Sequence, residues 1–374
     1  DHPDATNADA PKEIPDEECI AFAKKLEDAV IADDGHSAGD LFAWGEMVDR
    51  ALQGLSSPEH PNQIVENMRA GGAQRNMQLP KTLGAQIKEG GSYKFLRIRS
   101  GPDGMRVVFR LLGANGGLNY HEMTLGRREN KVVATDMYIF FSGETMPQSV
   151  RQMALVDSVM SDIKMRSPEV QQELKKYDIY SFLMAGAYQE GRFEDCIAMY
   201  GKMRPSLQKE KSLLLQRLLA ARNVGEQAEA AAIEAFRAVY PDEVCVDLIA
   251  LDSLFRRKAY REAREAIDRI DKAVGGDPYL HVLRANTYLM EDKFEDADNE
   301  AKAAIAEDST RTDAWWVRVT VALKMQKFAR AVDLLNTLKE DHGQEPADLT
   351  DPLFAEFMKS PEYKTWLKEK PSNP

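Results

Sequence analysis

The residue types that usually carry metal or enzymatic chemistry are few and widely spaced in this chain of 374 residues. No two of its six histidines, at 2, 36, 60, 121, 281 and 342, lie within four residues of each other. HExxH, GxSxG, Walker A and GxGxxG patterns are all missing from the sequence. Three cysteines, Cys19, Cys196 and Cys245, form no CxxC or other metal-binding spacing. The sequence therefore predicts no metal site, no serine-hydrolase site and no cofactor.

One pair of residues has suitable types for proton transfer. Asp136 and Tyr138 are two residues apart in KVVATDMYIFFSG (131–143), a run that is rich in β-branched and aromatic residues and reads as a strand. Alternate residues of a strand share a face, so both side chains should point the same way. A buried Asp beside a Tyr can act as a general base with a hydrogen-bond donor. Strands also alternate polar and aromatic residues for packing alone, and packing is the interpretation that we favour.

The elements that would position this pair predict an α+β domain over 17–146. Residues 17–79 carry helical segments, of which 19–34 and 37–52 have apolar residues at helical spacing. Four short runs at 93–100, 105–113, 117–126 and 131–143 then read as strands, and GPDG, ANGG and RREN between them are typical of hairpin turns. Helices followed by an antiparallel meander define an α+β class.

The order of these elements and the closing strand KVVATDMYIFFSGE resemble the nuclear-transport-factor-two-like fold, in which a curved sheet wraps around helices and leaves a conical pocket. A cystatin-like sheet around one helix is the alternative. Some members of the first family are isomerases or dehydratases that place Asp, His and Tyr in the pocket. The resemblance implies small-molecule binding or such an activity as an alternative function, with these candidate residues: His36, Asp40, Tyr120, His121, Asp136 and Tyr138.

A repeat occupies the second half of the chain. RFEDC at 192–196 recurs as KFEDA at 293–297. Between and beyond them, similar positions follow at a nearly constant spacing, namely Phe193, Gln227, Tyr260, Phe294 and Phe328. Three residues after each marker the side chain is small: Cys196, Ala230, Ala263, Ala297 and Ala331.

This period resembles the tetratricopeptide repeat (TPR), a helix–turn–helix unit of about 34 residues. The resemblance implies a multi-domain chain whose C-terminal part is an all-α solenoid of five units over 177–340, with small residues where the two helices of a unit cross. The second repeat, with Gln227 and Glu234 at its key positions, should be distorted. Residues 147–176 should form a connecting or capping helix. The segment 341–374 should cover the last unit, because an open solenoid end exposes core surface.

The same resemblance implies a binding groove along the first helices of the units. Its positions carry aromatic, apolar and some polar residues, which suits a segment of another protein with hydrophobic anchors. A clamp for a carboxylate pair is not indicated, since only Asn286 fits it. We therefore expect a non-enzymatic scaffold for protein–protein interaction, with these groove residues: Tyr188, Arg222, Leu248, Asp252, Phe255, Arg256, Tyr279, Asn286, Met290, Trp316, Thr320 and Lys324.

Composition limits the partners and suggests a location. The net charge of −12 argues against nucleic-acid binding, which needs clustered Lys and Arg. The sequence contains no run of roughly 18 apolar residues that could span a membrane. Residues 1–16, polar and acidic, read as a disordered tether left after a secretion or lipoprotein signal is removed, which is compatible with a lipid anchor. An extracytoplasmic location, periplasmic or secreted, is expected, with a cytoplasmic one left open.

Overall fold

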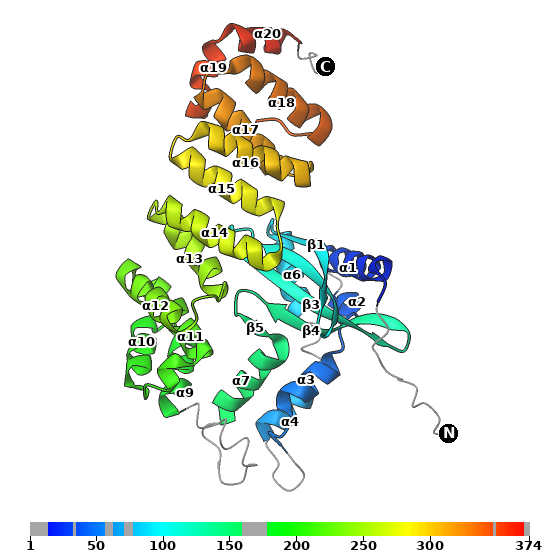
Figure 1. Cartoon of the computed structure of the whole chain (residues 1–374), viewed down its shortest axis with the longest axis vertical. Helices are drawn as coiled ribbons and strands as arrows, with labels where there is room; N and C mark the ends of the chain where they lie inside the picture. Colours follow the sequence, from blue (N-terminus) through cyan, green and yellow to red (C-terminus); the bar gives the residue numbers. More distant parts are fainter. Residues whose placement is uncertain are drawn as a thin grey trace, which may run out of the picture. The chain divides into compact units, whose positions relative to one another are not determined.

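The computed structural model describes residues 14–32, 35–56, 63–70, 78–158, 178–346 and 349–369. The chain divides into two compact units, Asp1–Ile249 and Ala250–Pro374, with the boundary inside helix α13 (Cys245–Arg256). The first unit combines helices with an antiparallel sheet, and the second is helical throughout its described residues (Figure 1). The predicted fold class, an N-terminal α+β part followed by an all-α part, is confirmed. The predicted tether over 1–16 falls largely outside the described residues.

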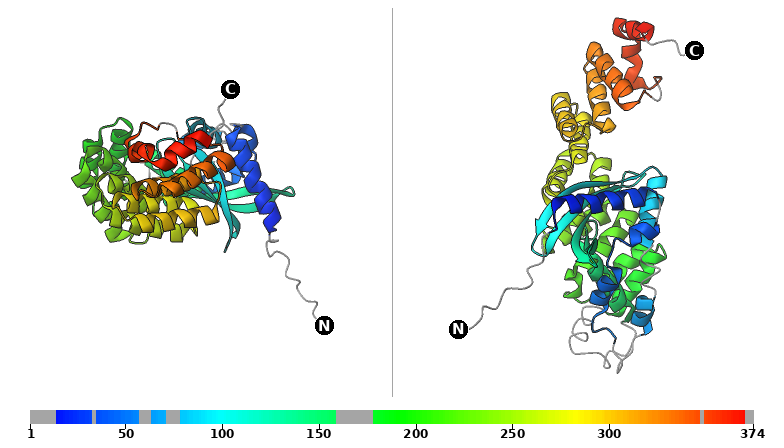
Figure 2. Two further views of the ribbon diagram at one scale, coloured as in Figure 1. Left: turned by 90° about the horizontal axis from the view of Figure 1, so that it is seen from above. Right: turned by 90° about the vertical axis from the view of Figure 1, so that its right-hand side faces the viewer.

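Helix α1 (Asp16–Ile31) begins with three acidic residues, Asp16, Glu17 and Glu18, whose charges suit the positive end of the helix dipole. Its apolar side is buried and lies along one face of the sheet (Figure 2). The described residues between α1 and the sheet form four shorter helices: α2 (Gly35–Gly39), α3 (Trp44–Leu52), α4 (Gln63–Ala70) and α6 (Gln78–Lys88).

The sheet is an antiparallel meander in the order β1-β2-β3-β4-β5. Its strands are β1 (Ser92–Gly101), β2 (Gly104–Leu112), β3 (Leu118–Arg128), β4 (Lys131–Ile139) and β5 (Glu144–Thr145). The four predicted strands are present, but the last one ends at Ile139 instead of Gly143. The chain turns there, with Gly143 in the left-handed region at φ +67°, and β5 returns to pair with the end of β4.

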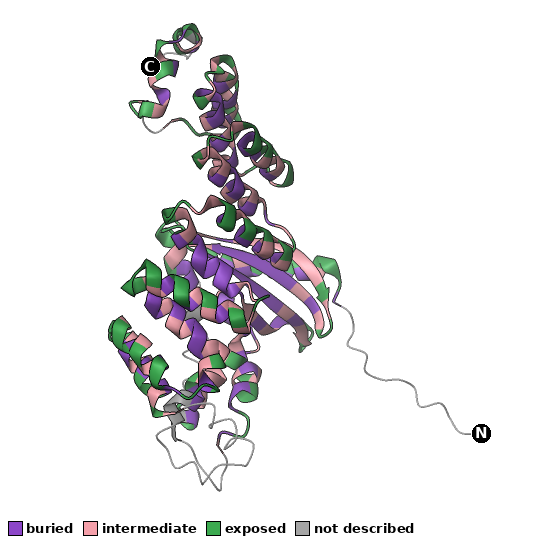
Figure 3. Cartoon of the chain, turned by 60° about the vertical axis from the view of Figure 1, so that its left-hand side comes forward, coloured by how far each residue is buried: buried purple, intermediate pink, exposed green. Residues whose placement is uncertain are grey.

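Helix α7 (Met146–Ser158) follows the sheet and packs on α3 and α4 through a small apolar cluster that includes Leu52, Val65 and Leu155. It covers the first part of the predicted connecting helix over 147–176. Residues 159–177 lie outside the described part of the chain. The main core of the α+β region lies between α1 and the sheet, and Figure 3 shows buried residues running through the strands.

Paired helices follow in the described residues from 178 onward. In the first unit they are α9 (Ile179–Gln189), α10 (Phe193–Lys202), α11 (Lys211–Val224) and α12 (Glu226–Val239), with a short 3-10 turn at Leu207–Lys209. After α13, the second unit contains α14 (Tyr260–Val274), α15 (Pro278–Met290), α16 (Phe294–Glu307), α17 (Thr312–Lys324) and α18 (Phe328–His342). This run of paired helices is consistent with helical repeats.

The small residues sit where the period placed them in four of five pairs. Cys196, Ala263, Ala297 and Ala331 are each the fourth residue of a second helix, and all are fully buried. The prediction for Ala230 was wrong, because Ala230 is exposed and the equivalent position in α12 belongs to buried Glu229. Second helices therefore begin at a nearly constant spacing, from Phe193 through Glu226, Tyr260 and Phe294 to Phe328, and only the first step is shorter than the rest.

The turns between paired helices explain that exception. In four pairs, three residues separate the helices and the middle one is left-handed: Gly191, Lys258, Asp292 and Gln326. This conformation lets a helix end and its chain reverse within three residues. In the second pair, Gly225 alone joins α11 to α12, so the marker position moves from Gln227 to Glu226. The second pair therefore differs from the other four in the length of its turn.

The described part of the C-terminal segment packs on the last helix pair. After a short turn at Pro352–Phe354, helices α19 (Ala355–Lys359) and α20 (Pro361–Glu369) pack Phe354, Phe357 and Trp366 against α17 and α18. Trp366 Nε1 also donates a hydrogen bond of 2.7 Å to Asn336 Oδ1 of α18. The aromatic residues thereby cover apolar surface of α17 and α18 that would otherwise be exposed to water.

Candidate functional site

The catalytic candidates of the α+β region do not converge, as far as the described residues show. Asp136 and Tyr138 share one face of β4, but His121 of β3 pairs with Ile139 and so points to the opposite face. Asp136 accepts hydrogen bonds from the backbone N–H of Met137 (2.7 Å) and from Arg50 Nη2 (3.3 Å). Burial raises the pKa of the Asp136 carboxyl, and the hydrogen bond from Met137 opposes that rise.

Tyr138 is engaged by its neighbours on the sheet. Its ring packs edge-to-face on Phe140 at 5.0 Å. Across the strand pair it faces Glu122, which accepts hydrogen bonds from Arg99 (3.0 Å) and Arg106 (2.8 Å). Burial raises the pKa of Tyr138, so the phenol stays protonated at neutral pH. This face is thus built from ion pairs and ring contacts.

The other candidates are dispersed. Tyr120 is fully buried, whereas Asp40 is exposed. His36 belongs to α2, and its side chain lies outside the described residues.

His121 is buried in the core, where its ring contacts two polar side chains. Its Nδ1 lies 3.2 Å from Tyr93 Oη, and its Nε2 lies 3.2 Å from Asn119 Nδ2. The Asn119 Oδ1 accepts the backbone N–H groups of Tyr120 and Phe141, so the amide NH₂ is the group that faces the ring. His121 therefore accepts at Nε2 and carries its proton on Nδ1. Burial lowers the pKa of His121 to about 4, which keeps the ring neutral.

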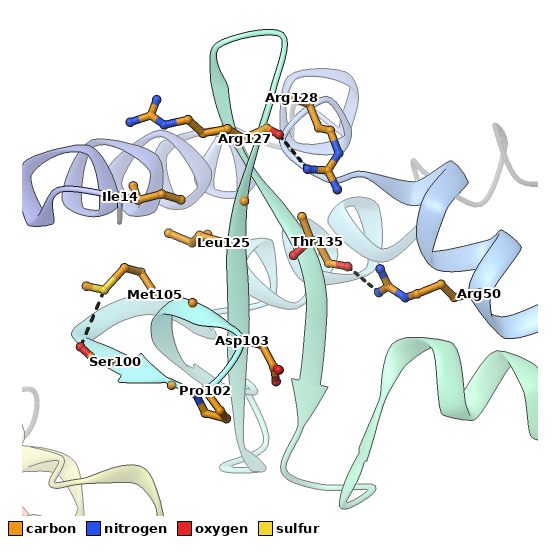
Figure 4. Close-up of a pocket in the computed structure, with 13 residues that line it drawn as sticks. Ile14, Arg50, Ser100, Pro102, Asp103, Met105, Leu125, Arg127, Arg128 and Thr135 are labelled. Atoms are coloured by element: carbon orange, nitrogen blue, oxygen red, sulfur yellow. Dashed lines mark hydrogen bonds between the residues drawn. The ribbon is translucent and has the colours of Figure 1, made fainter. Parts of the chain in front are cut away.

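A pocket of about 760 Å³ opens at one end of the sheet (Figure 4). Figure 4 shows Ile14, Met105 and Leu125 on one side and Thr135 and Arg50 on the other. The lining comes from the β1–β2 turn, β3, β4, the segment before α1, and α3, namely Ile14, Arg50, Ser100, Gly101, Pro102, Asp103, Gly104, Met105, Leu125, Gly126, Arg127, Arg128 and Thr135. Its size falls in the range of pockets that hold small molecules.

The arginines of this pocket already have anionic partners. Arg127 pairs with Glu18 at 2.6 Å, and Arg128 binds both carboxylate oxygens of Glu46. These hydrogen bonds lower the pKa of both glutamates, which remain charged. Arg50 donates to the Thr135 carbonyl (2.6 Å) as well as to Asp136. A bound anion would have to compete with these carboxylates, so the pocket suits a neutral ligand with an apolar side.

Sequence reasoning missed this pocket. Arg127 and Arg128 begin RREN, which the sequence indicated only as a hairpin turn, and Arg50 gave no signal because its partners lie 85 and 86 residues away. The turn GPDG at 101–104 was recognised as a hairpin, which could have indicated a sheet end, but nothing in it identifies the elements that face it.

The predicted groove positions of the first unit are largely involved in packing. Tyr188 packs edge-to-face on Phe193 at 5.7 Å, Arg222 Nε lies 3.7 Å from Glu229 Oε1, and Leu248 is buried.

In the second unit, several groove positions contact neighbours while others face solvent. The Arg311 guanidinium lies 4.8 Å above the Tyr279 ring, Trp316 donates to Gln344 (2.9 Å), and Thr320 donates to the Trp316 carbonyl. Phe255 and Asn286 are half-buried. Solvent-facing positions are Asp252, Arg256, Met290 and Lys324, and Met290 exposes 65% of its surface.

Three further observations narrow the chemistry. Among the described residues, no group of three His, Cys, Asp or Glu side chains is placed to bind a metal ion. Cys19, Cys196 and Cys245 are buried free thiols. None of the described helices combines the length and apolar character needed to cross a membrane.

Comparisons with family models, with curated proteins and with solved structures found no match to this chain.

Proposed function

We propose that this chain is a non-enzymatic interaction protein whose C-terminal helix pairs are TPR repeats. In this proposal, a segment of another protein binds the first helices of the pairs in the compact unit Ala250–Pro374. The observation that carries the proposal is Met290, an unbranched apolar side chain that is 65% exposed at the end of α15. Half-buried Phe255, Tyr279 and Trp316 occupy other predicted groove positions of α13, α15 and α17. Exposed methionine among aromatic residues is typical of surfaces that accept hydrophobic anchors.

A photo-reactive amino acid at position 290 should cross-link to one defined peptide of a partner protein. With that peptide in hand, Met290→Asp should weaken its binding about 30-fold, the effect of losing a central anchor worth about 2 kcal/mol. The matched control is Ala329→Asp, at an exposed position of α18, which should bind as the parent does. Equal weakening by both variants, or by neither, would place the binding surface elsewhere.

The pocket at the sheet end supports a second candidate, the binding of a small neutral molecule by a domain of the cone-like or cystatin-like type. The observation in its favour is the 760 Å³ volume with one apolar side and one polar side. Fragments found by ligand-observed NMR should bind the parent chain and lose at least tenfold in affinity to Ser100→Trp, which fills the pocket. Lys131→Trp, exposed and outside the lining, is the control. Hits that bind Ser100→Trp unchanged would exclude the pocket.

A further inference from the structure

Helix α9 presents an exposed apolar face. Ile179, Phe182 and Leu183 are 42%, 39% and 43% exposed. Gly186 lies on the same face, and a Cβ added there would meet nothing within 4 Å. The four residues are spaced i, i+3, i+4 and i+7, which is the spacing of one side of a helix. Other exposed large apolar residues among those described, such as Ile31 or Met153, do not form such a group.

The repeat identifies what this face does elsewhere in the chain. Helices α9, α15 and α17 are each joined to their second helix by the same three-residue turn, so their positions can be matched directly. The α9 face corresponds in α15 to Leu280, Leu283, Arg284 and Thr287, and in α17 to Ala314, Val317, Arg318 and Val321.

In both later helices this face docks on the preceding second helix. Arg284 of α15 donates to Asp268 (2.8 Å) and Asp271 (2.6 Å) of α14, and Thr287 Oγ1 accepts from Arg264 of α14 at 3.1 Å. Leu280 and Thr287 are fully buried.

The α17 face repeats the arrangement. Arg318 donates to Asp298 of α16 at 3.1 Å, and Ala314, Val317 and Val321 are at most 5% exposed. The face of a first helix at these four positions is therefore a helix-docking surface.

The α9 face differs from the other two in one informative way. Leu183 stands where α15 and α17 carry an arginine that pairs with a carboxylate. An occupant of the α9 face thus needs an apolar stripe and no matching acid.

We infer that this face binds an amphipathic α-helix of a partner protein, laid where the preceding second helix of the stack would lie. Apolar anchors at i, i+3, i+4 and i+7 are the usual pattern of such recognition. A second copy of the chain is a poorer occupant, because three partly exposed side chains fall far short of the roughly 800 Å² per partner that stable dimers bury. The inference is independent of the proposed site near Met290.

The test begins with a photo-reactive amino acid at position 182 of the full chain. The expected product joins residue 182 to a partner segment that carries apolar residues at i, i+3 and i+4. A synthetic peptide of that segment should bind the full chain and gain helical circular dichroism. Phe182→Glu combined with Leu183→Glu should weaken this binding at least 30-fold, and Ala198→Glu, exposed on α10, should leave it unchanged.

A second variant guards against misfolding of the first. Gly186→Phe points into open space, so the chain should keep its melting temperature while the bulky ring blocks the docking helix. Cross-links only to another copy of the chain, or only to the chain's own residues, would overturn the inference. So would the lack of any cross-link, or a peptide that binds all variants equally. The two surfaces are tested separately. If the surface at Met290 fails to bind a partner while the α9 face at Phe182 binds one, only the proposed function fails, and the reverse result rejects only this inference.

Discussion

Replacing Ala297 with leucine should lower the free energy of unfolding of the second unit by about 3 kcal/mol, at the upper end of what overpacking costs. Ala297 is fully buried near the start of α16, in a cluster that also contains Ala285 of α15 and Ala314 of α17. Three alanines from three helices meet there because the helices approach closely. A leucine side chain would force α15 and α16 apart or adopt a strained rotamer.

Urea unfolding followed by tryptophan fluorescence can measure this effect. Three of the four tryptophans, Trp315, Trp316 and Trp366, lie in the second unit, so the signal mainly reports its unfolding. Ala306→Leu is the matched control, because Ala306 is exposed on the same helix and should shift stability by no more than about 0.5 kcal/mol. Equal stability of the two leucine variants would mean that the helices of the pair do not depend on a small residue at their crossing.

The helix pairs could be predicted from the sequence because their packing imposes a local rule. A small side chain is required where the two helices of a pair cross closely. A small residue therefore recurs once per helix pair in the sequence, at Cys196, Ala263, Ala297 and Ala331. The prediction failed at Ala230 because positions were counted as if every turn between paired helices had the same length. With Gly225 as the sole connecting residue, the register of α12 moves by one and Glu229 takes the buried place.

The surfaces were less predictable because they depend on contacts between distant segments. Arg50 of α3 meets Thr135 and Asp136 of β4, and Arg128 meets Glu46, yet no local pattern links these residues. Trp316 has the type and position of a groove residue, but it donates a hydrogen bond to Gln344. The spacing of the repeat does not predict this contact. Residue type and helical position identify a candidate surface, whereas the partner of each side chain requires the fold.

His121 illustrates how such contacts change chemistry. Proposed from the sequence as a candidate acid–base residue, it faces the core between Tyr93 and Asn119. Protonation at Nε2 would direct a second N–H at the Asn119 amide NH₂, which is itself a donor. Burial adds a desolvation cost for the charged ring, and together they favour the neutral form in the folded protein.

Acid should therefore destabilise the α+β region through this one ring. The folded-state pKa of His121 is about 4, against an ordinary value of 6.5, so the unfolded chain binds more protons between these two values. The contribution of the neutral His121 ring to the free energy of unfolding is complete above pH 6.5 and falls as pH drops, with a loss of about 3 kcal/mol by pH 4.

The variant His121→Gln tests this effect, because glutamine keeps a donor and an acceptor without titrating. Urea titrations read by hydrogen exchange of β2–β4 should show the parent losing about 3 kcal/mol more than His121→Gln between pH 7 and 4. Parallel pH profiles for the two proteins would show that the ring is protonated or solvated in the folded state.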